Sequence, residues 1–161
     1  MDDLRSAPIP ALRDDDHVRG DGQTVVFYGD FACPRCALAH ERLLDRPARR
    51  VFRHFALRAK HPRALPLAYA AEAAALQGAF WSFHDSLYAD PGRLDDPHLW
   101  ERAETLGLDV ALFDADRRSD AVAARVARDV RDAMRAGIVT TPTLVVDGVL
   151  RPGPDGVSAL G

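Results

Sequence analysis

The most informative stretch of the sequence is Tyr28-Gly29-Asp30-Phe31-Ala32-Cys33-Pro34-Arg35-Cys36. It continues the β-branched and aromatic run that begins at Thr24, and such a run is typical of a strand buried on both faces. Proline is favoured at the first position of a helix, so Pro34 predicts that a helix begins there with Cys33 at its N-cap. The stretch therefore predicts a buried strand that leads directly into a helix, with two cysteines at the junction.

The spacing of the two cysteines suits thiol–disulfide exchange, which requires a thiolate, whereas an ordinary cysteine has a pKa of about 8.5. The dipole and free N–H groups of a helix start should lower the pKa of Cys33. The backbone N–H of Cys36 stands where it could donate to an N-cap side chain, and Arg35 adds a positive charge. We expect Cys33 to attack a substrate disulfide and Cys36, one turn later, to resolve the mixed disulfide.

A C-x-x-C pair can also be half of a zinc site or an inert pair of buried thiols. Zinc needs four ligands, and although His40 could face Cys36, no fourth ligand is obvious, so we predict no metal. A cysteine at a helix start before Pro34 argues against inert thiols. We expect no cofactor apart from the redox-active disulfide of Cys33 and Cys36.

The rest of the chain predicts a second strand, a block of helices and a final hairpin. The strand–helix–strand unit implies parallel strands joined by a right-handed crossover, and Asp147-Gly148 is typical of a tight hairpin turn. The expected elements are a strand over 51–57, helices over 65–77, 80–88, 96–106, 109–116 and 120–135, and hairpin strands before and after Asp147-Gly148. In the 96–106 helix, Asp96 is the expected cap and Pro97 the first position. We divide the chain into an irregular arm over 1–23, a domain over 24–151 with a helical insertion at about 65–136, and a turn-like tail over 152–161.

Composition places the chain among ordinary globular proteins. Its 161 residues fit one domain, and two cysteines are too few for a disulfide-stapled scaffold. The formal net charge is −3 with acids and bases interleaved, which gives no electrostatic case for binding nucleic acid. No signal peptide is visible and no apolar run reaches the roughly 20 residues of a membrane span. These features predict a cytoplasmic location and no membrane segment.

Several motifs, in this order, resemble the DsbA-like branch of the thioredoxin superfamily. They are the stretch at 28–36, Asp16 to Gly20 before the first strand, Arg53 to Leu57, His61-Pro62, Ala70 to Ala74, Gln77 to Trp81, His84 to Tyr88, Thr140-Thr141-Pro142-Thr143 and Val146-Asp147-Gly148. Similar domains are also fused to sodium/proton antiporters of actinobacteria.

The resemblance implies an α/β thioredoxin-like fold with a helical insertion between the βαβ unit and the C-terminal hairpin. It also implies a protein disulfide oxidoreductase whose Thr141-Pro142 bond forms a cis-proline loop beside the cysteines. There the backbone of Thr141 would receive a substrate strand by β-addition. The implied partners are proteins or small molecules that carry a disulfide or a dithiol, with an unknown redox partner.

The sequence departs from the family pattern at two points, and three questions about site and function have alternative answers. The dipeptide between the cysteines is Pro34-Arg35, whereas the best-known periplasmic oxidants have Pro-His, and the direction of exchange is undetermined. The family's closing helix is missing after the hairpin or is supplied by a second chain, as in a dimer. Asp30 is either a proton relay beneath the cysteines or a solvated turn residue. A non-catalytic thioredoxin-like binding module or regulatory domain is the alternative function. A glutathione-dependent enzyme of related fold is disfavoured by the second cysteine, Cys36.

Overall fold

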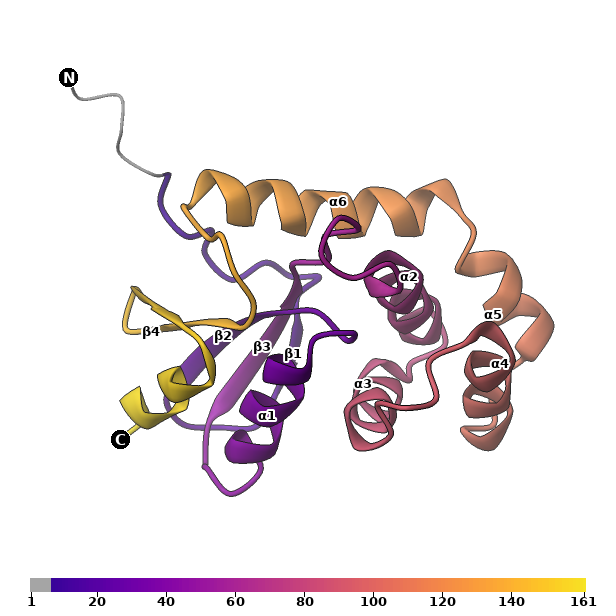
Figure 1. The fold of residues 1–161 in the computed structure, drawn as a ribbon, viewed down its shortest axis with the longest axis horizontal. Coiled ribbons are helices and arrows are strands. Elements are labelled where there is room, and N and C mark those ends of the chain that lie inside the picture. Colours follow the sequence, from indigo (N-terminus) through magenta and orange to yellow (C-terminus); the bar gives the residue numbers. More distant parts are fainter. Residues whose placement is uncertain (1–6) are drawn as a thin grey trace.

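The computed structural model describes residues 7–161 (Figure 1). It contains a five-stranded mixed sheet, six α-helices and one short 3₁₀ helix. In chain order these are β1 (His17–Arg19), β2 (Thr24–Gly29), α1 (Pro34–Leu43), β3 (Arg49–His54), α2 (Ala64–Ala75), α3 (Phe80–Ala89), α4 (Asp96–Thr105), α5 (Val110–Asp116), α6 (Asp120–Arg135), β4 (Thr143–Val146), β5 (Val149–Pro152) and η1 (Pro154–Ala159). The predicted thioredoxin-like α/β fold with a helical insertion is confirmed.

The sheet has the strand order β1-β3-β2-β4-β5, with β2 and β3 parallel and the other pairs antiparallel. Successive side chains of β2 point to opposite faces, as the pleat requires. Val25 and Phe27 pack with α1 and the helical block, whereas Val26 and Tyr28 pack with residues of α6. Both faces of the central strand are therefore covered, as its unbroken apolar run predicts, with α1 on one side and α6 on the other (Figure 1).

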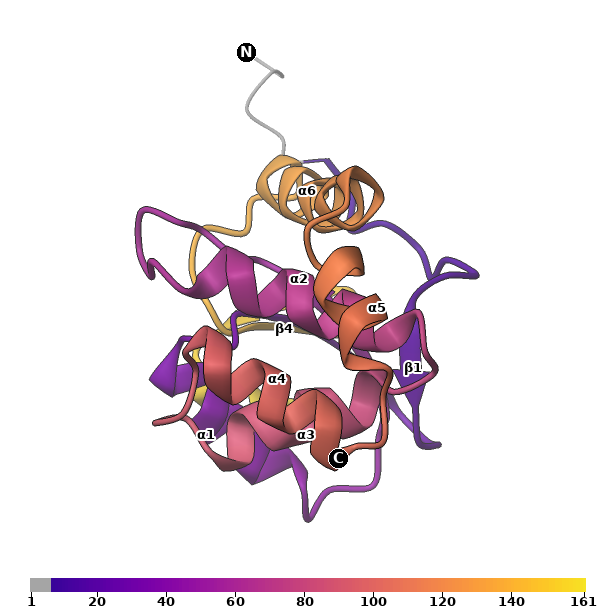
Figure 2. The same cartoon turned by 90° about the vertical axis from the view of Figure 1, so that its right-hand side faces the viewer.

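The helical insertion forms a block beside the sheet. Figure 2 looks onto it, with α2, α3, α4 and α5 toward the viewer and α6 above them. Helix α2 is buried on most of its circumference because its many alanines let α3, α5 and α6 approach closely. Within the described residues no helix is long and apolar enough to cross a membrane.

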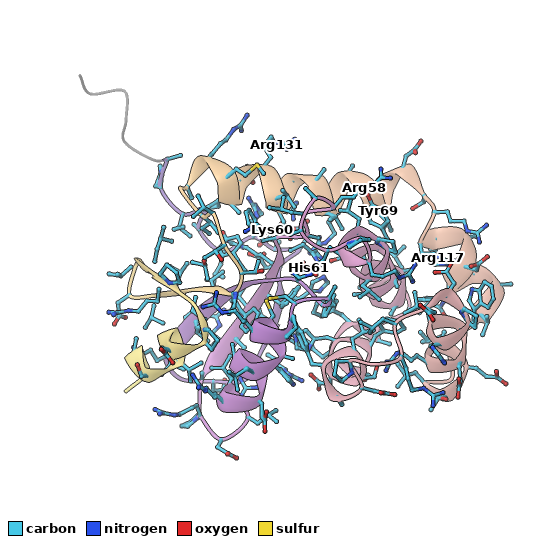
Figure 3. All side chains as sticks on the ribbon, in the orientation of Figure 1. Arg58, Lys60, His61, Tyr69, Arg117 and Arg131 are labelled. Carbon is cyan, nitrogen blue, oxygen red and sulfur yellow. The ribbon has the colours of Figure 1, made fainter. Side chains whose placement is uncertain are left out.

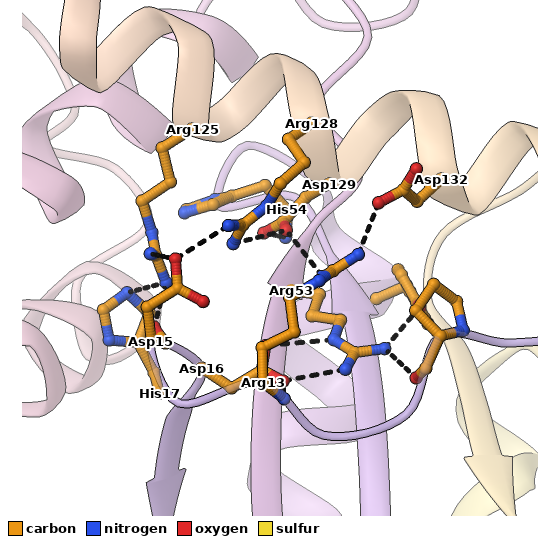
Figure 4. Close-up of polar contacts among 12 residues, drawn as sticks. Arg13, Asp15, Asp16, His17, Arg53, His54, Arg125, Arg128, Asp129 and Asp132 are labelled. Carbon is orange, nitrogen blue, oxygen red and sulfur yellow. Dashed lines mark hydrogen bonds and ion pairs between the residues drawn. The ribbon is translucent and has the colours of Figure 1, made fainter.

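The N-terminal arm was expected to be irregular, and for three residues this is wrong. His17–Arg19 form β1, which pairs antiparallel with β3. The guanidinium of Arg53, buried in β3, holds the segment before β1. It donates to both carboxylate oxygens of Asp16 at 3.0 and 2.7 Å, to the carbonyls of Pro10 and Ala11, and to the Tyr28 hydroxyl (Figure 4).

The same arm is joined to α6 by ion pairs. Asp15 accepts hydrogen bonds from Arg125 and Arg128 at 2.8 and 2.7 Å, and Arg13 pairs with Asp132 (Figure 4). The arm is therefore fixed across the edge of the sheet by charges from two elements.

The C-terminal tail is also more ordered than expected. Residues 154–159 form η1, which packs on α1 and β4, and Val157 and Leu160 are buried in the main core. A short 3₁₀ helix of this chain therefore follows the hairpin, where we expected a turn-like tail.

The other differences are shifts of element ends. The second strand, β3, covers Arg49–His54 rather than 51–57, and α2 ends at Ala75. Asp95 is the N-cap of α4, so Asp96 is its first residue. The hairpin is confirmed, since Asp147 and Gly148 have φ of 52° and 75°, the left-handed region that such a turn needs.

Candidate active site

The loop between β2 and α1 is held by its own backbone. Gly29 ends β2 where a Cβ would lie 2.4 Å from Phe27 and 2.9 Å from Phe52, so a larger residue would not fit. The Asp30 carboxylate accepts the N–H of Ala32 at 2.8 Å. The N–H of Cys33 donates to the Asp30 carbonyl at 3.2 Å. This turn presents residue 33 at the helix start.

Cys33 is the N-cap of α1, as predicted, and it is 6% exposed, while Cys36 is fully buried one turn further along. Both are free thiols. The pKa of Cys33 is lowered from 9.0 to about 5. A hydrogen bond from the Cys36 thiol is the main cause; burial opposes it, and Thr141 and the N–H groups of Cys36 and Arg35 add to the lowering.

One of the expected contributions to this lowered pKa is wrong. The N–H of Cys36 does contribute to the lowering, although it lies 3.1 Å from the Cys33 carbonyl, to which it donates, and the Cys33 side chain makes no capping hydrogen bond. The charge of Arg35 is not among the main causes of the shift. Its guanidinium reaches toward the C-terminal segment instead, since a Cβ on Gly153 would lie 2.8 Å from its Nη2.

Cys36 has the opposite tendency. Burial raises its pKa well above the ordinary value, and its hydrogen bond to Cys33 and the charge of the Cys33 thiolate raise it further. The first cysteine is therefore an anion at neutral pH, whereas the second is a neutral thiol behind it.

The loop that follows α6 lies against the first sulfur. The peptide bond between Thr141 and Pro142 is cis, and both residues are buried. The carbonyl oxygen of Thr141 lies 3.8 Å from Cys33 Sγ. The loop is held by two further hydrogen bonds, from Gly153 N–H to the Pro142 carbonyl at 2.7 Å and from the Thr143 hydroxyl to the Thr140 carbonyl at 2.7 Å.

Asp30 is 2% exposed, which excludes its interpretation as a solvated turn residue. Burial raises its pKa from 3.8 to about 6, while the hydrogen bond from the Ala32 N–H opposes this shift. The Tyr88 hydroxyl donates to its backbone carbonyl at 3.3 Å. A carboxyl with this pKa can exchange a proton near neutral pH. Of the candidate residues, Asp30, Cys33, Cys36, Thr141 and Pro142 come together. Pro34 is the exposed first residue of α1, next to Cys33, and the Arg35 side chain points elsewhere.

A buried charge cluster near this region was not found from the sequence. Glu72 of α2 accepts hydrogen bonds from the Nε2 atoms of His17 and His54, each at 2.8 Å, and Arg125 Nε lies 2.9 Å from it. Burial opposes its ionisation, but these partners outweigh burial and hold its pKa far below the usual range. The one signal was an acidic residue in an alanine-rich helix.

A second group has the composition of a metal site. The ligand atoms of His40, His84 and Asp85 lie within 4.8 Å of one another, and no other such group of three occurs within residues 7–161. Arg19, however, donates to both oxygens of the Asp85 carboxylate, at 2.7 and 2.8 Å. A cation would have to displace this guanidinium, so the donor set does not fit a metal ion.

Comparison with known proteins identifies relatives of this arrangement. A family model described as Thioredoxin matches residues 14–160. A thioredoxin-like oxidoreductase from Silicibacter pomeroyi DSS-3 has 27% sequence identity and a TM-score of 0.77, over 91% of this chain and 92% of that one. DsbA2 from Pseudomonas aeruginosa has 26% identity and a TM-score of 0.66, over 88% and 87%. BdbD from Bacillus subtilis shares the fold, with a TM-score of 0.77 at 18% identity over 96% and 95%.

The similar curated sequences carry the names of antiporters. The Na(+)/H(+) antiporter NhaA 3 of Salinispora tropica is 44% identical over 94% of this chain and 24% of the antiporter. The NhaA antiporter of Herminiimonas arsenicoxydans is 42% identical over 83% of this chain and 22% of the antiporter. The chain spans about a quarter of the length of these relatives. The predicted similarity to domains of antiporter proteins is confirmed.

Proposed function

Since this chain belongs to the thioredoxin family and has a DsbA-type arrangement, we propose that it is a thiol–disulfide oxidoreductase that acts through Cys33 and Cys36. The observation that carries the proposal is the asymmetry of the two sulfurs. The pKa of Cys33 is lowered to about 5 beside the Thr141 carbonyl, whereas that of Cys36 is raised. Disulfide exchange requires these two roles, an attacking thiolate and a second thiol that resolves the mixed disulfide.

In the first step, the Cys33 thiolate attacks one sulfur of a substrate disulfide. A Cys33–substrate disulfide forms, and the other substrate sulfur leaves as a thiolate that takes up a proton from water. In the second step, Cys36 loses its proton and attacks Cys33 Sγ, which releases the reduced substrate and leaves the Cys33–Cys36 disulfide. The substrate gains two electrons, and the protein dithiol supplies them. The reverse sequence oxidises a substrate dithiol.

We assign Asp30 as the group that accepts the proton of Cys36. Its pKa of about 6 means that it is largely ionised at neutral pH yet can be protonated at small cost. Thr141 is the proposed docking point, because an extended substrate segment could pair with its backbone next to Cys33. The pair's own disulfide is the only cofactor in this proposal, and the cytoplasmic location stays a prediction.

Single-turnover reduction of glutathione disulfide tests the proposal. The reduced wild-type protein should produce two equivalents of glutathione per protein and form the Cys33–Cys36 disulfide. Cys33→Ser should be inactive, and Cys36→Ser should stop at a Cys33–glutathione mixed disulfide that mass spectrometry detects. Equal activity of wild type and Cys33→Ser would refute the assignment and favour a non-catalytic binding module.

A further inference from the structure

A groove lies between α2 and α6, outside the candidate active site. It is an open depression with a volume of about 580 Å³, and its lining includes Arg58, Leu65, Tyr69, Val130, Arg131 and Met134. Most of these side chains are apolar, and Met134 is 54% exposed. Tyr69 lies on α2 and Arg131 on α6, on the two sides of the groove (Figure 3). An apolar groove open to solvent is a typical docking site.

The cations at this groove differ from the other arginines of α6. Arg125 and Arg128 are paired with Asp15 on the far side of the helix. Arg58, Arg131 and Arg135, in contrast, form no ion pair with a carboxylate of residues 7–161. The net charge of the chain is −3, whereas the charge at the edge of this groove is positive.

One side-chain contact links the loop at the groove to the loop of the candidate active site. Lys60 follows Arg58 by two residues in the loop before α2, and its ammonium lies 3.5 Å from the Val139 carbonyl. Val139 is 75% exposed and stands two residues before Thr141, whose carbonyl touches Cys33 Sγ. Figure 3 shows Lys60 and His61 on the loop that also carries the groove residue Arg58. A hydrogen bond thus joins the loop that carries Arg58 to the segment that leads to Thr141 and Cys33.

We propose that this groove docks an acidic, amphipathic helical segment of a protein substrate whose disulfide or dithiol reacts at Cys33; this inference rests on the proposed function. Apolar side chains would enter the groove, and Asp or Glu side chains would face Arg58, Arg131 and Arg135. The stretch Ala127–Arg135 of α6 is about 12 Å long, which matches two turns of a helix. The groove offers apolar and cationic side chains together, which match the apolar and acidic faces of an amphipathic helix.

Two synthetic peptides provide the probe. Each has one cysteine in a mixed disulfide with 5-thio-2-nitrobenzoate and a flank of about 12 residues, long enough for three helical turns. One flank alternates Leu and Glu at helical spacing, and in the other Gln replaces every Glu. Attack of Cys33 on the peptide sulfur releases the coloured thiolate, and Cys36 then releases the peptide, so the second-order rate constant is read directly.

The wild-type protein should react at least about tenfold faster with the Glu peptide at low ionic strength, as expected for electrostatic steering. The preference should fall to about unity in Arg58→Glu/Arg131→Glu and be much reduced at about 0.5 M salt. Met134→Ser should slow the reaction of both peptides, because both lose the same apolar contact, and should leave the preference unchanged. Arg118→Glu is the matched control, because Arg118 is 64% exposed and lies away from the groove; it should keep the full preference.

Glutathione disulfide separates the two hypotheses. If oxidised wild type does not react with glutathione and reduced wild type does not react with excess glutathione disulfide, the proposed function fails. If wild type and all variants reduce glutathione disulfide equally but wild type reacts alike with both peptides, the docking inference is overturned and the proposed function stands. Wild type could instead sediment with phosphatidylglycerol vesicles and show no preference between the peptides. If Arg58→Glu/Arg131→Glu abolished that sedimentation, the docking inference would be overturned in favour of binding to a membrane surface.

Discussion

The alkylation rate of Cys33 in the reduced protein should titrate with a midpoint near pH 5, because the pKa of its thiol is lowered to about 5. Iodoacetamide reacts with the thiolate and not with the thiol, so its rate follows the ionised fraction. Cys33→Ser measures the background from the more buried Cys36, whose raised pKa keeps it neutral.

The pKa of Cys33 is read from the dependence of the alkylation rate on pH, and not from the rate at neutral pH alone. At pH 7 a pKa of about 5 gives about 99% thiolate, against about 1% for a pKa of 9. The weaker nucleophilicity of a low-pKa thiolate costs about 40- to 100-fold over four pKa units. The two effects nearly cancel at pH 7. At pH 5, however, the protein should keep half of its maximal rate, whereas an ordinary cysteine would be almost unreactive.

Cys36→Ala tests the main cause of the lowered pKa. It removes the thiol that donates to Cys33, and the loss of about 1–2 kcal/mol should raise the midpoint by roughly one pH unit. Cys36→Ser is the matched control, since its hydroxyl can still donate and should keep the midpoint near the wild-type value. A wild-type midpoint of about 8 or above, or equal midpoints for the two variants, would refute the reasoning.

Three further predictions concern buried charges and use urea unfolding of the reduced protein. The pKa of Asp30 is raised from 3.8 to about 6, so its ionisation opposes folding at high pH; Asp30→Asn should stabilise the protein at pH 8, by up to about 3 kcal/mol, and not at pH 4. A lower stability of this variant at pH 8 would contradict the shift. The pKa of Glu72 is lowered, so its carboxylate stabilises the folded state above its unfolded pKa of about 4.5, and this stabilisation is lost as the pH falls. Glu72→Gln should therefore lower the free energy of unfolding by about 3–5 kcal/mol at pH 7 and by less in acid. A cost that does not change with pH would show that charge is not its source. Arg53→Met should cost about 3–5 kcal/mol because it leaves Asp16 buried and unpaired. The exposed control Arg118→Met should change stability by about 0.5 kcal/mol or less, and an equal cost for the two variants would contradict this prediction.

Local sequence patterns were sufficient to predict those elements whose cause lies in a few neighbouring residues. The apolar run from Thr24 to Tyr28 predicted a central strand because a strand covered on both faces needs no polar side, and β2 covers these residues and Gly29. Pro34 predicted the start of α1, and Asp147-Gly148 predicted the hairpin through the left-handed backbone that these residues tolerate. Each signal lies within a few residues of the feature that it predicts.

Features that depend on distant residues were missed. The strand β1 has one apolar residue, Val18, and exists because the exposed edge of β3 supplies hydrogen-bond partners for it. The helix η1 is short and rich in Gly and Pro, and burial of Val157 and Leu160 holds it. Glu72 meets His17 and His54 only after three elements have packed together. No window of local sequence contains these contacts.

The difference between position in the sequence and contact in the fold also explains why we wrongly expected the charge of Arg35 to lower the pKa of Cys33. Its position between the cysteines suggested that its charge stabilises the thiolate, but a side chain at a helix start can turn outward, and this one reaches toward Gly153. The groups that face the Cys33 sulfur are instead the Cys36 thiol and Thr141. These groups are dipoles held in place by α1 and by the loop before β4, so salt screens them far less than it would screen an exposed charge. The pKa of Cys33 is therefore lowered mainly by the thiol one turn further along α1, with a smaller contribution from Thr141 of a distant segment, and the charge of Arg35 is not among the main causes.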